Sequence, residues 1–151
     1  MPDDTDRLIL RHLLADPAGR TSTIAERCGL SPAVVARRLE RLKTKGILRG
    51  QLAEINWTAL GYAVKVSLRF TLDKTHARAF DEFLTAARKV PEVTEIQTFL
   101  GRVDVRLAII ARNMEHYQII YRARVLTLPH IADIEALMHI ATIKTTPGLP
   151  I

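Results

Sequence analysis

The stretch Thr21–Gly50, TSTIAERCGLSPAVVARRLERLKTKGILRG, predicts two short helices joined by a turn that contains Gly29. The second helix has a clear start, because Ser31 is a favoured N-cap residue and Pro32 is well tolerated at the first helical position. Gly46 predicts its end. Apolar residues recur at helical spacing on one side of this second helix, at Val35, Leu39 and Leu42. This pattern is typical of a helix-turn-helix motif.

The free face of the second helix is strongly basic. Residues 37–49 contain six basic residues and one acidic residue, a net charge of +5 in a chain whose total charge is +6. A basic helix that follows such a turn suits the major groove of DNA, and the alternative is a basic helix that is merely solvated. The residues expected to contact DNA are Ser22, Ser31, Pro32, Ala33, Arg37, Arg38, Arg41, Lys43 and Lys45.

These residues fall into two expected groups. The small residues at the helix start and Arg37 are expected near the bases, where small side chains let the backbone approach. The basic residues from Arg38 to Lys45 are expected near phosphates or as braces of the helix, and Arg38 has the alternative of folding back on its own domain. On the preceding helix, Thr21 or Ser22 is the expected N-cap.

The segments on either side complete the first domain. Acidic residues at Asp3–Asp6 predict a helix start, and the apolar pattern continues through Asp16. Residues 47–55 are interpreted as a short strand pair, or wing. We therefore expect a winged helix-turn-helix domain at residues 1–54, a linker at 55–61 and a second domain at 62–151.

The second domain alternates between strand and helix periodicity. Strict alternation of apolar and polar residues from Val64 to Leu72 predicts a strand with one buried face. The later elements expected are a helix at 75–89, a strand at Val93–Leu100, a strand at Val103–Ile109, a helix at Met114–Leu128 and a strand at Ile131–Ile143. The order β-α-β-β-α-β is that of a ferredoxin-like α+β domain. Its helices cover one face of the sheet, and apolar residues such as Ile110 on the other face favour a second copy as the cover.

Composition excludes several classes of protein. The sequence has no apolar run of membrane-spanning length and no signal-peptide pattern, so a cytoplasmic protein is expected. A single cysteine excludes a disulfide framework, and the five histidines lack a metal-binding spacing. The sequence contains neither a phosphate-binding loop nor a catalytic dyad. We therefore expect no metal, no cofactor and no enzymatic activity.

The chain resembles the leucine-responsive and asparagine-responsive (Lrp/AsnC, feast/famine) regulators of prokaryotes over nearly its whole length. The matching positions are Asp6–Leu10, Gly29–Pro32, Val35, Arg37–Leu39, Leu42, Gly46–Leu48, Leu60–Gly61, Val90–Val93, Gly101 with Asp104, Tyr117, Leu128–Pro129, Ile143–Lys144 and Leu149–Pro150. The resemblance implies sequence-specific regulation of transcription, with double-stranded DNA as partner and with a C-terminal domain of the RAM type. It also implies a homodimer that assembles further, to a tetramer or an octamer.

The resemblance further implies an amino-acid effector bound in a cleft between C-terminal domains. Carried over by position, the effector-binding residues are Gly101, Arg102, Val103, Asp104, Met114, Leu137, Met138 and His139. The loop at Gly101 can offer backbone N–H groups to a carboxylate, and Asp104 can either pair with an ammonium group or cap the turn. The chain departs from the family in having Val105 where an aromatic residue is frequent and His130 where glycine is common. These departures leave open an acidic effector attracted by Arg102 or Arg106, and also the absence of any ligand.

Two other functions fit the same architecture. An architectural protein that packs DNA without an effector would need the same helix and the same oligomer. Sirohaem decarboxylases resemble this two-part arrangement, but residues 95–101 lack the histidine those enzymes carry there.

Overall fold

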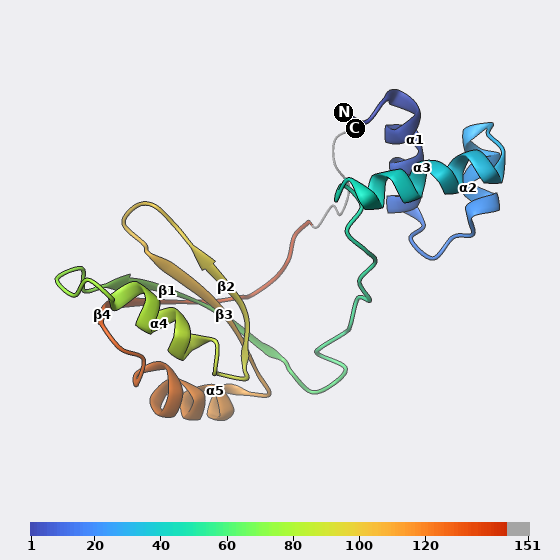
Figure 1. Ribbon diagram of the computed structural model, residues 1–151. Helices are drawn as coiled ribbons and strands as arrows, with labels where there is room; N and C mark the ends of the chain where they lie inside the picture. Colours follow the sequence, from blue (N-terminus) through green and yellow to red (C-terminus); the bar gives the residue numbers. More distant parts are fainter. Residues whose placement is uncertain (145–151) are drawn as a thin grey trace. The chain divides into compact units, whose positions relative to one another are not determined.

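The computed structural model describes residues 1–144 and divides the chain into two compact units (Figure 1). Met1–Glu54 belong to the first unit, and Ile55–Thr142 form the second. The Leu149–Pro150 motif lies outside the described residues.

The first unit is a three-helix domain. Its helices are α1 (Asp4–Ala15), α2 (Thr21–Cys28) and α3 (Pro32–Thr44). Ile9, Ile24 and Val35, one from each helix, meet in a core that is closed to solvent. Gly29 ends α2 in the left-handed conformation with φ of 66°, which glycine adopts without strain and which turns the chain sharply into α3. The helix-turn-helix motif is confirmed.

The helix starts explain why these segments are stable. Asp3 caps α1 in a capping box, in which Asp3 and Asp6 each accept the other's backbone N–H. The Ser31 side chain accepts the N–H of Val34 at the start of α3, as the sequence predicts. The predicted cap of α2 is wrong: Arg20 occupies the N-cap position without a side-chain hydrogen bond, and Thr21 and Ser22 are already inside the helix.

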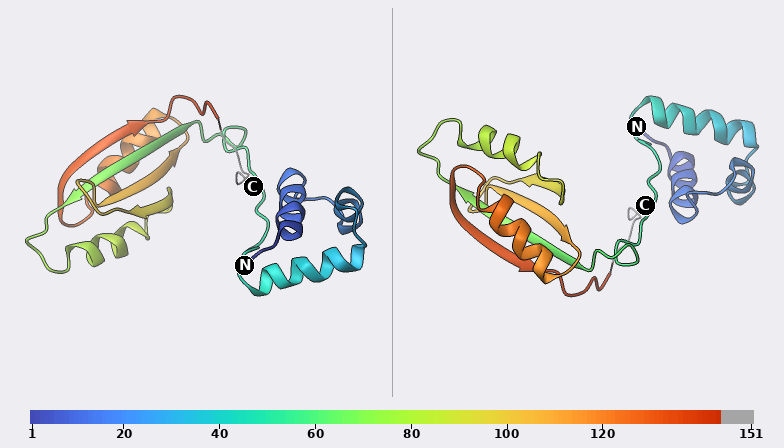
Figure 2. Two further views of the ribbon diagram at one scale, coloured as in Figure 1. Left: turned by 90° about the horizontal axis from the view of Figure 1, so that it is seen from above. Right: turned by 90° about the horizontal axis from the view of Figure 1, so that it is seen from below.

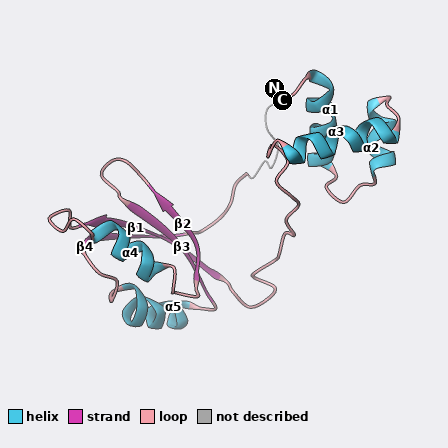
Figure 3. Cartoon of the chain, viewed as in Figure 1, coloured by secondary structure: helices cyan, strands magenta, loops and turns pink. Residues whose placement is uncertain are grey.

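The predicted strand pair after α3 is absent, since no strand precedes Val64 in the described chain, and Figure 3 shows this connection as a loop. The backbone N–H groups of Ile47 and Leu48 both donate to the carbonyl of Leu42. These bonds extend the end of α3 and remove the donors that a strand ladder would use. The Gln51 side chain donates to the carbonyl of Pro17, which ties the following loop to the end of α1.

The second unit contains a four-stranded antiparallel sheet in the order β2-β3-β1-β4, seen from two directions in Figure 2. Its elements are β1 (Val64–Leu72), α4 (Ala79–Ala87), β2 (Val93–Thr98), β3 (Val105–Ala111), α5 (Met114–Ile120), the π-helix η1 (Tyr121–Val125) and β4 (Ile131–Met138). This strand order and the two helices confirm the ferredoxin-like α+β fold.

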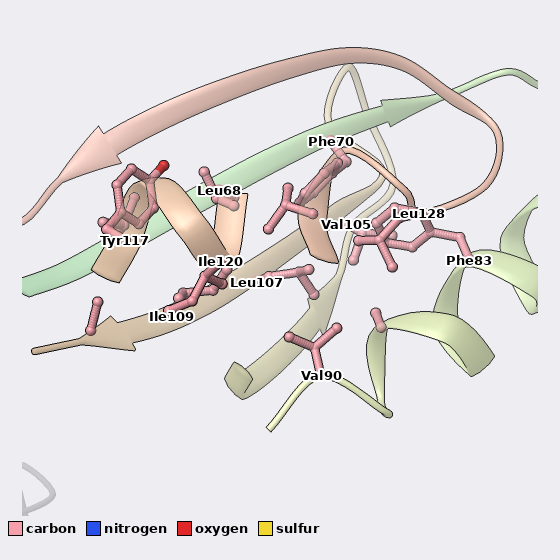
Figure 4. Close-up of a cluster of buried hydrophobic side chains, with 14 of the residues drawn as sticks. Leu68, Phe70, Phe83, Val90, Val105, Leu107, Ile109, Tyr117, Ile120 and Leu128 are labelled. Carbon is pink, nitrogen blue, oxygen red and sulfur yellow. The ribbon is translucent and has the colours of Figure 1, made fainter. Parts of the chain in front are cut away.

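One face of the sheet and both helices enclose the core of this unit. Leu68 and Phe70 of β1 and Leu107 of β3 are completely buried, as is Phe83 of α4. Figure 4 shows these side chains packed with Tyr117 and Ile120 of α5. The strict alternation predicted for β1 is therefore correct, because every second residue points into this cluster.

Several element boundaries differ from the predictions. The last strand ends at Met138 rather than at Ile143, because its partner β1 begins at Val64 and the final ladder bond joins the N–H of His139 to the carbonyl of Lys65. The last helix converts to η1 after Ile120, so its final turn is a π-helix that sequence periodicity does not signal. The helix predicted at 75–89 is limited to Ala79–Ala87. The second strand ends at Thr98 and the third begins at Val105, so the loop between them is longer than predicted.

The other face of the sheet is free of helices and is largely polar. It presents Lys65, Ser67, Arg69 and Thr71 from β1, which the burial pattern places opposite the core. No helix in residues 1–144 is long and apolar enough to cross a membrane.

Candidate functional site

The exposed surface of α3 carries the predicted DNA-contacting residues. Ser31, Pro32 and Ala33 are exposed at the start of the helix, and Arg37 is exposed one turn further on. Within residues 1–144, Arg37 forms no ion pair, so its guanidinium is available for an external anion. Ser22 is exposed on α2.

Two arginines of α3 are held by the start of α1. The carboxylate of Asp6 accepts from Arg38 Nη1 at 2.8 Å and from Arg41 Nη2 at 2.7 Å. Asp3 accepts from Arg38 Nη1 at 2.7 Å. Only 2% of the Asp6 side chain is exposed, so this four-residue cluster links α1 to α3 at the edge of the core. The alternative in which Arg38 folds back on its domain is the arrangement that the structure shows.

Electrostatics match this geometry. Burial alone would raise the pKa of the Asp6 carboxyl, but hydrogen bonds from Arg38, from the backbone of Asp3 and from Arg41 lower the pKa below its ordinary value of 3.8. The pKa of Arg38 is raised by its hydrogen bonds to Asp3 and Asp6. The carboxylate of Asp6 and the guanidinium of Arg38 therefore stay charged across the neutral range, and Arg38 is a brace of the helix.

The remaining basic residues face solvent near the end of α3. Lys43 pairs with Glu40 at 2.7 Å across one turn of the helix, and both side chains are more than half exposed. Lys45 follows as the C-cap residue. An exposed lysine can leave a surface pair at little cost, so both lysines remain candidates for phosphate contact.

The predicted effector residues divide between two ends of the sheet. The hairpin between β2 and β3 carries Gly101–Asp104 and is bonded to β1 at Phe70, whose carbonyl accepts the N–H of Asp104. His139 is bonded to Lys65, five residues away along β1, which corresponds to about 16 Å. Leu137 and Met138 are half-exposed near His139, and Met114 is half-exposed at the start of α5. One chain therefore does not bring the two groups together.

Asp104 is already engaged within its own chain. One carboxylate oxygen accepts the backbone N–H of Leu72 at 2.9 Å, and the other lies 3.0 Å from Lys74 Nζ. Burial would raise the pKa of this carboxyl, but the Leu72 and Lys74 bonds lower it. Asp104 thus holds the hairpin to β1, and the interpretation as a simple cap of the Gly101 turn does not describe its contacts.

Two cavities lie beside the same hairpin, on the helix-free face. The first, of about 360 Å³, is lined by Arg69, Arg102, Arg106 and apolar residues of the hairpin. The second, of about 550 Å³, shares Arg69 and Arg102 with the first and adds Asp133 and Glu135 of β4. The sequence analysis named Arg102 and Arg106 but missed Arg69, Asp133 and Glu135. The alternation of inward-facing and outward-facing residues along β1 and β4 could have placed these three on the helix-free face.

A second cluster was not predicted. The Nε2 atom of His130 lies 2.6 Å from Glu82 Oε2, and the His130 ring packs at a tilt of 38° against the ring of His76, with centroids 4.7 Å apart. His130 has a φ of 62°, a conformation that strains most side chains. Its bond to Glu82 holds the start of β4 against α4. No group of metal-binding side chains occurs in residues 1–144.

Comparison with known proteins agrees with this architecture. Residues 2–49 match a family of winged helix-turn-helix DNA-binding domains, and residues 65–149 match the Lrp/AsnC ligand-binding domain. The chain belongs to the Lrp/AsnC family. Lrp/AsnC membership accounts for both units, the three-helix domain and the ferredoxin-like domain.

Relatives in this family are similar over nearly their full lengths. The HTH-type transcriptional regulator Zrp of Zymomonas mobilis is 30% identical over 99% of this chain and 97% of its own length. The leucine-responsive regulatory protein of Escherichia coli is 30% identical over 99% of this chain and 91% of its own. A transcriptional regulator of Neisseria meningitidis, solved in complex with L-methionine, superposes with a TM-score of 0.90 at 26% identity and covers 99% of this chain and 97% of that one.

These relatives are named as regulators of transcription. This Lrp/AsnC protein is accordingly a transcriptional regulator with a helix-turn-helix domain, and not an enzyme. This result confirms the expectation that the chain is not an enzyme and is against the alternative of a sirohaem decarboxylase.

Proposed function

We propose that this protein recognises specific double-stranded DNA sites with α3 and regulates transcription as a symmetric oligomer, under the control of a small amino-acid effector. The observation that carries the DNA-binding part is the exposed start of α3. There, Ser31 to Ala33 leave room for base edges, and Arg37 projects without a partner among the described residues. Because the proposed ligand is chromosomal DNA, we propose that the protein acts in the cytoplasm of a prokaryotic cell.

The ion-pair cluster at Asp6 separates the basic residues that position α3 from those that can contact DNA. Arg38 and Arg41 are occupied by carboxylates, so we assign them to positioning of α3 rather than to phosphate contact. Arg37 is assigned to a base or a nearby phosphate, and Lys43 and Lys45 to phosphates. Ser22 is assigned to a phosphate contact from α2.

The helix-free face of the sheet supports a homodimer. A second copy is the proposed cover, because the face carries Ile110 and the half-exposed Leu137 beside its polar rows. A two-fold dimer presents two copies of α3 to two half-sites. Further assembly to a tetramer or an octamer is proposed from the family alone.

The effector is proposed to bind between copies. Gly101–Val103 lie far from Leu137–His139 within one chain, so a site that uses both groups needs two chains. Two solved relatives, from Neisseria meningitidis and Mycobacterium tuberculosis, are complexes with L-methionine, which supports an amino acid as the class of effector. The role of Asp104 is to hold the loop that offers the backbone N–H groups.

The DNA-binding proposal is tested with an Arg37→Ala variant. We expect its affinity for a selected DNA site to fall by about 1–3 kcal/mol, with a smaller loss on scrambled DNA. Fluorescence anisotropy measures both affinities, and Lys89→Ala, which removes an exposed cation from the other unit, is the matched control. The slope of log affinity against log salt is expected to be about −3 per domain, because three of the cations assigned to DNA, Arg37, Lys43 and Lys45, are not held by a buried carboxylate.

Two results would contradict this assignment. An unchanged affinity in Arg37→Ala would remove α3 from the interface. Equal affinity for selected and scrambled DNA would favour the architectural, DNA-packing function instead of sequence-specific regulation.

A further inference from the structure

The loop that follows α3 is fixed to the helical unit at both of its ends. At the first end, the backbone N–H groups of Ile47 and Leu48 donate to the carbonyl of Leu42 at 3.0 Å and 3.2 Å. At the second end, the Gln51 side chain donates to the carbonyl of Pro17. The short backbone between these two anchors therefore has a defined course.

Arg49 lies between the two anchors, and its side chain is exposed. Its neighbours Leu48 and Gly50 line a cavity of about 270 Å³ in the helical unit, whereas Arg49 does not. Within residues 1–144, the side chain of Arg49 forms neither an ion pair nor a hydrogen bond. The anchored loop thus presents a guanidinium whose donors are available to an external anion.

The same cavity locates Arg49 relative to α2 and α3. Its lining includes Thr21 at the start of α2 and Lys43 near the end of α3. Ser22, assigned above to a phosphate, follows Thr21 directly. Among the described residues, Lys43 pairs only with the exposed Glu40. Arg49 therefore lies on the edge of the domain that carries two of the proposed phosphate contacts.

The chain around Arg49 is rich in basic residues. Residues 41–53 contain four basic side chains, Arg41, Lys43, Lys45 and Arg49, and no acidic side chain. Arg41 is held by the buried carboxylate of Asp6 at 2.7 Å, and no carboxylate of the described chain holds Arg49. Arg49 therefore adds no ion pair to the fold, and its charge is available to a polyanion.

The length of α3 indicates which part of DNA this edge of the domain meets. The helix has 13 residues, which corresponds to about 20 Å, and the major groove is about 12 Å wide. When its start, at Ser31–Ala33, lies against the base edges, its end extends past the groove to the sugar-phosphate backbone. The loop that carries Arg49 follows that end directly.

We propose that Arg49 binds a backbone phosphate of the DNA site and that Gln51 is the residue that positions it. This inference rests on the proposed DNA-binding function and adds a residue to the same interface. The bond from Gln51 to Pro17 fixes the backbone two residues beyond Arg49, so less conformational freedom is lost when the guanidinium meets a phosphate. The hydrogen bonds between arginine and phosphate are charge-assisted and therefore strong.

Fluorescence anisotropy of the full-length protein on a selected DNA site, over a range of salt concentrations, tests the contact. With Arg49 included, the slope of log affinity against log salt is expected to be about −4 per domain, in place of the value of about −3 that follows without it. Arg49→Ala is expected to make the slope shallower by about one and to weaken binding about five- to tenfold near 0.1 M salt. The loss is expected to be similar on selected and scrambled DNA, because a phosphate contact carries no sequence information. Arg49→Lys keeps the charge and is expected to retain the slope.

A double-mutant cycle tests the positioning role of Gln51. If its bond to Pro17 fixes the loop, Arg49→Ala costs about twofold or more less affinity in a Gln51→Ala background than in the native sequence. A lower melting temperature in Gln51→Ala, with an equal effect of Arg49→Ala in both backgrounds, would show that Gln51 only stabilises the fold.

The matched control is Arg88→Ala, which removes an exposed arginine without an ion pair from the end of α4 in the other unit. It is expected to leave the slope and the affinity unchanged. Because Arg49 is exposed, Arg49→Ala is expected to keep the melting temperature of the native protein, which circular dichroism measures. Equal losses of affinity in Arg88→Ala and Arg49→Ala would reduce the effect to net charge and would overturn the proposal.

Two further results would overturn the proposal, and a third would also overturn the DNA-binding function. An unchanged slope in Arg49→Ala, while Arg37→Ala still weakens binding, would show that α3 binds DNA without Arg49. A loss that is confined to sites with A·T-rich flanks, and that Arg49→Lys does not restore, would place the guanidinium in the minor groove instead of on a phosphate. If Arg37→Ala and Arg49→Ala both bind as the native protein does, the DNA-binding proposal fails together with this inference.

Discussion

Each unit contains a pair of neighbouring arginines, and the two pairs differ in how their guanidiniums are bonded. Arg38 and Arg41 of the helical unit share the nearly inaccessible carboxylate of Asp6 at 2.7–2.9 Å. Arg69 and Arg106 of the sheet unit face each other across neighbouring strands, and their nearest carboxylates lie 3.3 Å and 3.4 Å away. An arginine that is bonded tightly to a buried carboxylate positions a helix. Arg69 and Arg106 have only distant, half-exposed carboxylates, and Arg106 is held instead by the neutral side chains of Ser67 and Gln97.

The largest expected effect follows from removing the shared carboxylate. Asp6→Ala leaves two guanidiniums at the edge of the core without their main partner. We expect the free energy of unfolding of the helical unit to fall by about 2–3 kcal/mol, below the full cost of breaking a buried pair because Arg41 is partly solvated. Urea denaturation followed by circular dichroism measures this loss.

The matched control for that experiment is Glu40→Ala. It breaks an ion pair on the same helix whose two side chains are more than half exposed, and it is expected to change stability by less than about 0.5 kcal/mol. Equal losses in the two variants would mean that the Asp6 cluster does not position α3.

Acid pH provides a second test of the same cluster. The pKa of Asp6 is lower in the folded chain than its ordinary value of 3.8, so the folded state binds fewer protons than the unfolded state near that pH. The stabilisation is therefore complete above about pH 4 and is lost as the pH falls through the lower folded pKa. Urea denaturation of the native sequence between pH 7 and pH 2 is expected to show this loss, and Asp6→Asn is expected to reduce it, since the pKa values of Asp3, Glu82 and Asp104 are also lowered in the folded chain. A decline that begins between pH 7 and pH 5 would point to another group.

The sequence predicted local structure better than long-range pairing. Ser31 and Pro32 mark the start of α3, and the alternation of Val64–Leu72 marks β1, because each signal lies within one element. The absence of the wing could not be read in the same way, since it depends on where the N–H groups of Ile47 and Leu48 find acceptors. Local patterns do not encode that choice.

The same difference between local patterns and long-range contacts applies to the candidate sites. The exposed basic face of α3 was visible as helical spacing, but the capture of Arg38 by Asp6 joins residues 32 positions apart. The pairing of His130 with Glu82 spans 48 positions. Such contacts depend on how helices and strands pack, so sequence reasoning could name Arg38 and not its partner.

A third pair, His130 with Glu82, has a contact as short as those of Asp6, but its side chains are more exposed than that of Asp6. His130 sits at a φ of 62°, and its ring contacts Glu82 at 2.6 Å. In a Glu82→Gln background, His130→Gly is expected to stabilise the sheet unit by about 1 kcal/mol, because glycine relieves the backbone strain. With Glu82 present, the lost contact offsets that gain. Thermal denaturation of the four variants measures the difference, and identical effects in both backgrounds would show that the contact contributes nothing.

The smallest expected effect on stability tests the loose arrangement itself. Glu135→Gln removes the carboxylate opposite Arg69, and both side chains are about half exposed, so the free energy of unfolding should change by less than about 0.5 kcal/mol. Urea denaturation of Glu135→Gln and of the native sequence measures this change. A loss above about 1 kcal/mol would place Arg69 and Glu135 with the Asp6 cluster, as groups that hold the fold, and would remove the distinction between the two pairs of arginines.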